Sequence, residues 1–163
     1  MGVRDSGAFL ARCITGGLVG GLVAAAWTAI YAGLRGLPLW SPLALYDAHF
    51  MGLSPKGLPT ASLANAVVAG IVWQMLLGIA LGAFFGLLAG AFLSPQVLGR
   101  TGALVGALYG FFLWAVLTAG GLTVESRAFR RDMASWSAAV AFLLIGLVVG
   151  AFARRQSPAS RNG

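Results

Sequence analysis

Charged residues are scarce in this chain, and long intervals have none. Only 9% of the 163 residues are charged, whereas 59% are hydrophobic. A soluble domain carries about 25% charged residues, so the composition predicts an integral membrane protein. Four intervals contain no Asp, Glu, Lys or Arg: 13–34, 57–99, 101–124 and 133–153. Each can hold the ~20 apolar residues that cross a bilayer, which predicts an all-α bundle of four transmembrane helices.

The spans and the first loop can be placed approximately from the flanking residues. We expect the spans at about 8–34, 63–93, 101–122 and 134–152. Together they form a single transmembrane domain over residues 1–163. A signal peptide is the alternative for the first span, but its length favours a retained helix. In the first loop, Ser41 followed by Pro42 is typical of a helix start, which predicts a short interfacial helix at 41–52.

Cysteine and histidine each occur once, which restricts metal and redox chemistry. The lone Cys13 excludes an intrachain disulfide or a cysteine-based metal cluster, and we expect a buried thiol. His49 alone cannot build a multi-histidine metal site within one chain. Chemistry inside a membrane normally needs ionisable groups that face the bundle interior, and the four uncharged intervals supply none. We therefore predict no catalytic, metal-binding or cofactor-binding residues, and no enzymatic activity.

The charges that are present are mostly basic, with a formal net charge of +7. They do not form a basic patch with interleaved aromatic residues, so we expect no nucleic-acid partner. Flanking arginines at the membrane surfaces explain the net charge instead, with the lipid bilayer and other transmembrane helices as partners. Arg154 and Arg155 follow the last predicted span directly, which favours a cytoplasmic location for both termini.

Glycine, in contrast, is abundant and regularly spaced. The second predicted span carries small residues at every fourth position, interrupted by Gln74. In water such glycines would weaken a helix by about 1 kcal/mol each, whereas in lipid they let a second backbone come close. The predicted helix-packing residues are Gly16, Gly20, Gly70, Gln74, Gly78, Gly82, Gly86, Gly90, Gly102, Gly106, Gly110, Gly146 and Gly150.

The glycine pattern also predicts which helices meet. Ser94 and Pro95 should end the second span, with a tight turn through Gly99–Arg100 leading into the third. We therefore expect the Gly90 end of the second span to contact the third span. The Gly70 end should face the first span, the fourth span or a separate subunit.

An internal repeat is one interpretation of the glycine pattern, and chance similarity between apolar helices is the other. The segment TGGLVGGL at 15–22 matches TGALVGAL at 101–108. Gly78 and Gly82 match Gly146 and Gly150 in the same way. If the repeat is real, the chain consists of two helical hairpins related by a pseudo-twofold axis along the membrane normal.

Few polar residues offer a candidate site. Gln74 is the one strongly polar residue deep in a span, and it either fixes helix register by a hydrogen bond or contacts a solute in a pore. Tyr46, Asp47 and His49 form a possible polar loop site. The alternative for these three residues is the polar face of the interfacial helix.

The first third of the chain resembles a known family. The run Gly17-Leu-Val-Gly-Gly-Leu-Val23, then Pro38, Ser41-Pro42, Tyr46-Asp47-Ala48 and Gly52, is similar to the opening of the YagU-like bacterial inner-membrane proteins. The resemblance implies a small multi-pass protein of the bacterial inner membrane, and it implies no mechanism.

These observations predict a protein without catalytic activity. We expect a packing or accessory subunit of a membrane assembly, which docks through its Gly-xxx-Gly helix faces. The alternative is a small oligomeric channel or carrier for an unknown solute.

Overall fold

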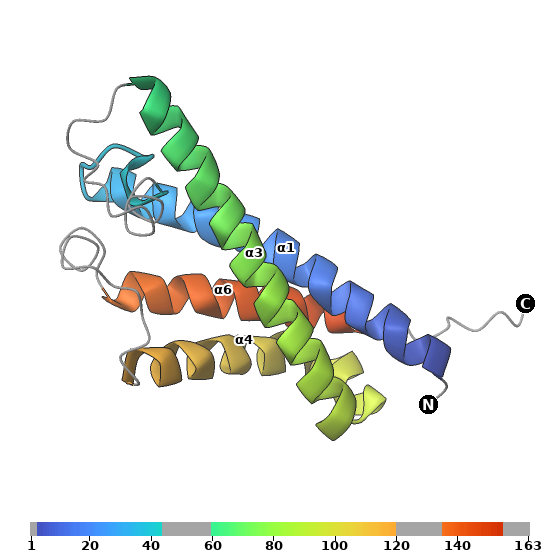
Figure 1. The fold of residues 1–163 in the computed structure, drawn as a ribbon. Coiled ribbons are helices and arrows are strands. Elements are labelled where there is room, and N and C mark those ends of the chain that lie inside the picture. Colours follow the sequence, from blue (N-terminus) through green and yellow to red (C-terminus); the bar gives the residue numbers. More distant parts are fainter. Residues whose placement is uncertain (1–2, 44–59, 120–134, 155–163) are drawn as a thin grey trace, which may run out of the picture.

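The computed structural model describes residues 3–43, 60–119 and 135–154, and Figure 1 shows its helices. The four long helices are α1 (Val3–Leu34), α3 (Thr60–Phe92), α4 (Pro95–Ala119) and α6 (Ser135–Ala153). Each contains a stretch that is long and apolar enough to cross a membrane. The predicted all-α fold with four membrane-crossing helices is therefore confirmed, and the described ranges contain no strand.

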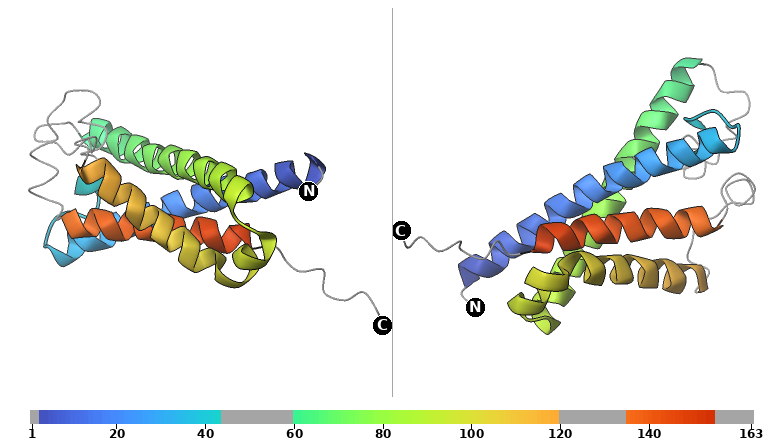
Figure 2. Two further views of the ribbon diagram at one scale, coloured as in Figure 1. Left: turned by 90° about the horizontal axis from the view of Figure 1, so that it is seen from below. Right: turned by 180° about the vertical axis from the view of Figure 1, so that it is seen from behind.

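The helices pack as a chain of antiparallel neighbours. α1 packs against α3 and against α6, and α4 packs against α6. α1 and α4 run in one direction and α3 and α6 in the other (Figures 1 and 2). The first residue of α1 and the last residue of α6 therefore lie at one end of the bundle, which we call the terminal end. The opposite end, where α1 stops and α6 starts, is called the loop end.

α3 is the helix that departs most from the common direction. Toward Thr60 it diverges from α6, as both Figure 1 and the right-hand view of Figure 2 show. α3 and α6 accordingly share only a small contact, although α3 is the longest helix. α1 is the central helix of the bundle, because both α3 and α6 pack against it.

α1 ends at a glycine with a left-handed backbone. Gly36 has φ of 70°, a conformation that costs an L side chain about 1–2 kcal/mol. The Gly36 amide donates to the Gly33 carbonyl oxygen at 3.0 Å, and the Leu37 amide donates to the Ala32 carbonyl oxygen at 2.9 Å. This pair of hydrogen bonds is a Schellman motif, which satisfies carbonyls that the helix end would leave open.

The junction between α3 and α4 is shorter than the sequence suggested. We expected Ser94 and Pro95 to end one helix and Thr101 to start the next, but α4 already begins at Pro95. The Ser94 hydroxyl accepts from the Val97 amide at 3.4 Å, so Ser94 caps α4 and Pro95 takes its first position. The Ser94-Pro95 pair therefore follows the end of α3, as expected, and it also forms the start of α4.

The predicted short helix in the first loop begins where expected. Residues 41–43 are helical, and residues 44–52 lie outside the described part of the chain. Pro42 and Leu43 are buried. This first turn packs against α3, where the Leu43 carbonyl oxygen faces Gly70.

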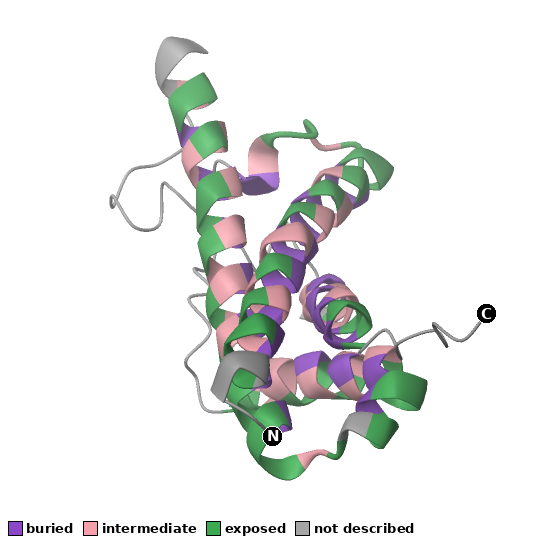
Figure 3. Ribbon diagram, turned by 90° about the vertical axis from the view of Figure 1, so that its right-hand side faces the viewer, coloured by how far each residue is buried: buried purple, intermediate pink, exposed green. Residues whose placement is uncertain are grey.

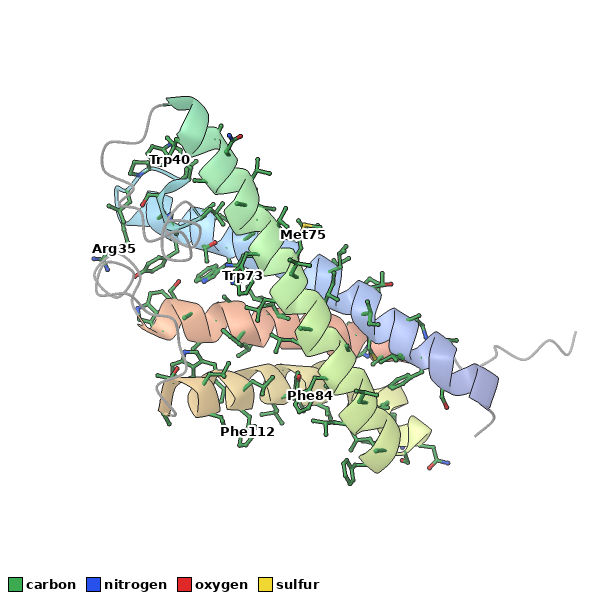
Figure 4. The ribbon with its side chains drawn as sticks, viewed as in Figure 1. Arg35, Trp40, Trp73, Met75, Phe84 and Phe112 are labelled. Atoms are coloured by element: carbon green, nitrogen blue, oxygen red, sulfur yellow. The ribbon has the colours of Figure 1, made fainter. Side chains whose placement is uncertain are left out.

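The outer surface of the bundle is apolar. Figure 3 shows the buried residues on the inner faces of the helices and the exposed residues outside. α4 is the least buried of the four helices, because only α6 covers it closely. Its large exposed side chains include Leu104, Leu108 and Phe112, and Figure 4 shows Phe112 directed away from the bundle. Such a surface suits contact with lipid chains.

A matched pair of glycine substitutions tests the end of α1. A Cβ on Gly36 or on Gly99 would meet nothing within 4 Å, so both sites have room for a methyl group. The two sites differ in backbone conformation, because only Gly36 has a positive φ. We expect Gly36→Ala to destabilise the protein by about 1–2 kcal/mol because of its positive φ. Gly99→Ala, inside α4, should be neutral or stabilising by up to about 1 kcal/mol. Thermal unfolding in detergent measures both, and equal effects would contradict the assigned helix end.

Candidate functional site

Glycines bring the backbones of α1 and α3 into direct contact. A Cβ on Gly17 would overlap the carbonyl oxygen of Gly78, and a Cβ on Gly78 would overlap that of Gly17. Two further contacts of this kind are Gly21 with the Gln74 carbonyl and Gly82 with the Cys13 carbonyl. A glycine has a second Cα hydrogen where the Cβ would be, so each of these hydrogens points at a carbonyl oxygen. Such Cα–H···O contacts contribute about 0.5–1 kcal/mol each.

The same arrangement joins α4 to α6. A Cβ on Gly106 would overlap the carbonyl oxygen of Gly146, and a Cβ on Gly146 would overlap that of Gly106. Two further contacts of this kind are Gly110 with the Phe142 carbonyl and Gly150 with the Gly102 carbonyl. The second hairpin is thus held by the same backbone contacts as the first.

The two sets of contacts correspond residue by residue. Gly17, Gly21, Gly78 and Gly82 in the first hairpin have Gly106, Gly110, Gly146 and Gly150 as counterparts in the second. For α3 and α6 this is the register that the sequence match predicted. For α1 and α4 the register differs, because the sequence match paired Gly17 with Ala103. The geometry supports a repeated hairpin. In this repeat, α1 and α4 are aligned by their glycine contacts and not by their sequence match.

The contact between the two hairpins also depends on glycine. A Cβ on Gly20 would lie 3.0 Å from the Ile145 Cα and 3.1 Å from its carbonyl oxygen. A Cβ on Gly16 would lie 2.8 Å from the Phe152 Cβ and 3.1 Å from the Val149 Cα. α1 therefore uses one glycine face for α3 and a second glycine face for α6.

A tyrosine occupies the counterpart of Gly20 in α4. When Gly17 is aligned with Gly106 and Gly21 with Gly110, Gly20 falls on Tyr109. The Tyr109 hydroxyl donates to the Leu81 carbonyl oxygen of α3 at 3.0 Å. Its ring lies 5.1 Å from the Phe85 ring, centroid to centroid. The phenol ring fills the space between α3 and α4, so their backbones remain apart.

The expectation that the Gly90 end of α3 contacts the third span is therefore wrong. A Cβ on Gly90 would lie 3.6 Å from the Phe9 ring of α1, and a Cβ on Gly86 would lie 3.1 Å from the Cys13 Cβ. α3 and α4 are not a closely packed pair, although they follow each other directly. The short junction limits how far their adjoining ends can separate, but side-chain size decides which helices pack.

At the Gly70 end of α3, Gly70 contacts the turn at 41–43, and the Gln74 carbonyl contacts Gly21 of α1. A Cβ on Gly70 would overlap the carbonyl oxygen of Leu43 and lie 2.8 Å from its carbonyl carbon. Gly70 thus makes room for the helical turn at 41–43. Gln74, one turn further along, faces α1 and is only 3% exposed. This burial between two helices fits the register role that was one of its two interpretations.

The sequence analysis missed a polar and aromatic cluster at the loop end. The Trp27 indole Nε1 donates to the Ser137 carbonyl oxygen at 3.1 Å and lies 3.2 Å from the Ser137 hydroxyl. The Tyr31 and Trp136 rings lie 5.1 Å apart and nearly perpendicular. Arg35 Nη1 donates to the Tyr31 hydroxyl at 3.2 Å. The spacing of residues 27, 31 and 35 along one helix face could have indicated this cluster.

The possible polar loop site of Tyr46, Asp47 and His49 lies outside the described residues. Within the described ranges, no group of three or more His, Cys, Asp or Glu side chains could hold a metal ion. Cys13 is a free cysteine and is buried, as expected.

Comparisons with protein-family models, with curated proteins and with solved structures find no match to this chain.

Substitution of Gly82 tests the glycine contact on α3. Gly82→Leu places a side chain against the Cys13 carbonyl, so we expect destabilisation by at least about 1–3 kcal/mol. Leu87→Ala on the same helix changes a side chain that is 62% exposed and should have a much smaller effect. Thermal unfolding of both variants in detergent measures the difference. Equal losses would show that the glycine stripe is not a packing face.

A disulfide tests which helix faces Gly86. In Gly86→Cys the new Cβ lies 3.1 Å from the Cys13 Cβ, slightly below the usual disulfide range of about 3.5–4.5 Å. We expect oxidation to link the two cysteines within one chain after a small shift. Gly102→Cys, which faces α6, serves as the control and should leave Cys13 free. The measure is the number of thiols labelled by a maleimide in denatured protein. Free thiols in the oxidised Gly86→Cys variant would contradict the α1–α3 pairing.

Proposed function

We propose that this chain is a small, non-catalytic multi-pass membrane protein that acts as a packing or accessory subunit of a larger membrane assembly. The observation that carries the proposal is the closure of two hairpins by backbone contacts at Gly17, Gly78, Gly106 and Gly146. Helices joined in this way form a rigid unit, which leaves their outer faces for partners.

The proposed docking surface for such a partner differs from the one that the sequence suggested. The glycine faces of α1, α3, α4 and α6 are already occupied within the chain. We therefore propose that the Gly-xxx-Gly faces pack the helices of this chain together and do not bind the partner subunit. The outer faces of α3 and α4, with Leu87 and Phe112 among their exposed side chains, take the role of docking surface in this proposal.

Location in a bacterial inner membrane, with both termini in the cytoplasm, is part of the same proposal. The resemblance of the first third of the chain to YagU-like proteins supports the inner membrane. The start of α1 and the end of α6 lie at one end of the bundle (Figure 1). Arg12, Arg100 and Arg154 belong to that terminal end, which agrees with the positive-inside rule.

A small carrier or channel is the second candidate function, favoured by two observations. Two equivalent hairpins in parallel orientation are an arrangement that transporters use. In addition, Trp114 Nε1 and Thr118 Oγ1 are buried on α4, one helical turn apart, and have no hydrogen-bond partner among the described residues. Buried polar atoms of this kind are available to a polar solute.

Flux measurements with a Gln74 variant separate the two functions. If Gln74 fixes the register of α1 and α3, the wild type should show no solute flux in liposomes and Gln74→Leu should behave the same. Purification in mild detergent should then recover a fixed partner subunit. Phe112→Ala on the outer face of α4 should weaken that association without lowering the melting temperature. A pure homo-oligomer with a robust flux that Gln74→Leu abolishes would overturn the accessory-subunit proposal.

A further inference from the structure

The aromatic cluster at the loop end fixes the position of one arginine. Trp27 of α1 donates its indole N–H to Ser137 of α6 at 3.1 Å, and the Ser137 side chain is fully buried. This hydrogen bond joins the last turns of α1 to the first turn of α6. Trp136, the neighbour of Ser137, is thereby placed against Tyr31, with 5.1 Å between ring centroids.

Tyr31 in turn holds Arg35. The tyrosine is only 3% exposed, so its ring has little freedom to move. Arg35 Nη1 donates to the Tyr31 hydroxyl oxygen at 3.2 Å. This hydrogen bond fixes the position of the guanidinium at the end of α1. The described residues offer no carboxylate to Arg35, which is an exposed residue whose guanidinium has further N–H groups.

The depth of these groups matches the headgroup layer of a bilayer. The membrane-crossing stretch of α1 ends at Leu34, and that of α6 begins at Trp136. Arg35 and Trp136 therefore stand together at one boundary of the apolar region, and Figure 4 shows Arg35 at the loop end. Trp136 is 56% exposed, which suits an indole ring in the interfacial layer.

We propose that Arg35, Tyr31 and Trp136 form a binding site for the phosphodiester of an anionic phospholipid headgroup. A guanidinium can hold two phosphate oxygens with parallel N–H donors, and the buried Tyr31 hydroxyl holds the guanidinium in position by accepting one of its N–H groups. The indole ring packs beside the glycerol region. The apolar surface below the site accommodates the acyl chains, which distinguishes a lipid from a free anion.

Lipid binding to the intact protein tests the site. Native mass spectrometry in detergent measures the affinity for dioleoyl phosphatidylglycerol and for dioleoyl phosphatidylcholine. We expect preferential binding of phosphatidylglycerol, with affinity lowered about tenfold by Arg35→Gln, because charge-assisted hydrogen bonds are lost. Tyr31→Phe keeps the ring and removes the hydroxyl, so it should weaken binding by a smaller factor. Arg154→Gln, at the terminal end, removes the same charge and should leave this binding unchanged.

The melting temperature of each variant shows whether the fold is retained, and Arg35 is exposed, so its substitution should not lower it. Equal effects of Arg35→Gln and Arg154→Gln would overturn the site, because the attraction would then depend on net charge alone. Full phosphatidylglycerol affinity in Arg35→Gln would overturn it as well. Displacement of the lipid by millimolar inorganic phosphate would show an anion site and contradict the assignment to a lipid.

Discussion

The close approach of backbones at glycine is the interaction on which the rest of this structure depends. In lipid, helix association gains nothing from hiding apolar side chains, so it relies on close packing and on weak polar contacts between backbones. Gly17 with Gly78, and Gly106 with Gly146, supply both in the two hairpins. Each contact is reciprocal, because each glycine faces the carbonyl oxygen of the other. A methyl group at any of these positions would separate the helices and remove the Cα–H···O contacts along with the dispersion energy.

α1 packs closely against a helix of the other hairpin, whereas α4 does not, and this difference follows from one position of the repeat. On α1 that position is Gly20, and the backbone of α6 comes within contact distance. On α4 it is Tyr109, whose hydroxyl reaches the Leu81 carbonyl while its ring keeps α3 away. The central place of α1 and the exposure of α4 are both consequences of this exchange. The same packing brings the end of α1 to the start of α6, which assembles Trp27, Tyr31 and Trp136 at the loop end.

Much of this architecture could be predicted from the sequence, because it depends on local properties. Uncharged intervals of sufficient length identified the four helices, and four-residue spacing identified Gly78, Gly82, Gly106 and Gly146, whereas the predicted packing residues did not include Gly17 and Gly21. The pairing of helices could not be predicted in this way. The expectation that α3 packs on α4 used the short connection between them and ignored the size of Tyr109. The start of α4 at Pro95 was missed because Ser-Pro signals both the end of one helix and the start of another. The spacing of residues 27, 31 and 35 could have indicated the α1 half of the cluster around Arg35, but its α6 partners lie far away in the sequence and could not be predicted from that spacing.

The repeated backbone contact is the central claim, and equivalent substitutions in the two hairpins test it most directly. The measurement is the melting temperature in detergent of Gly17→Ala and Gly106→Ala, with Gly90→Ala as the reference. A Cβ at Gly17 or Gly106 meets a carbonyl oxygen, whereas a Cβ at Gly90 lies at an ordinary 3.6 Å from the Phe9 ring. The account predicts that Gly17→Ala and Gly106→Ala lower the melting temperature to a similar extent, while Gly90→Ala leaves it nearly unchanged. A melting temperature that is insensitive to both Gly17→Ala and Gly106→Ala would contradict it.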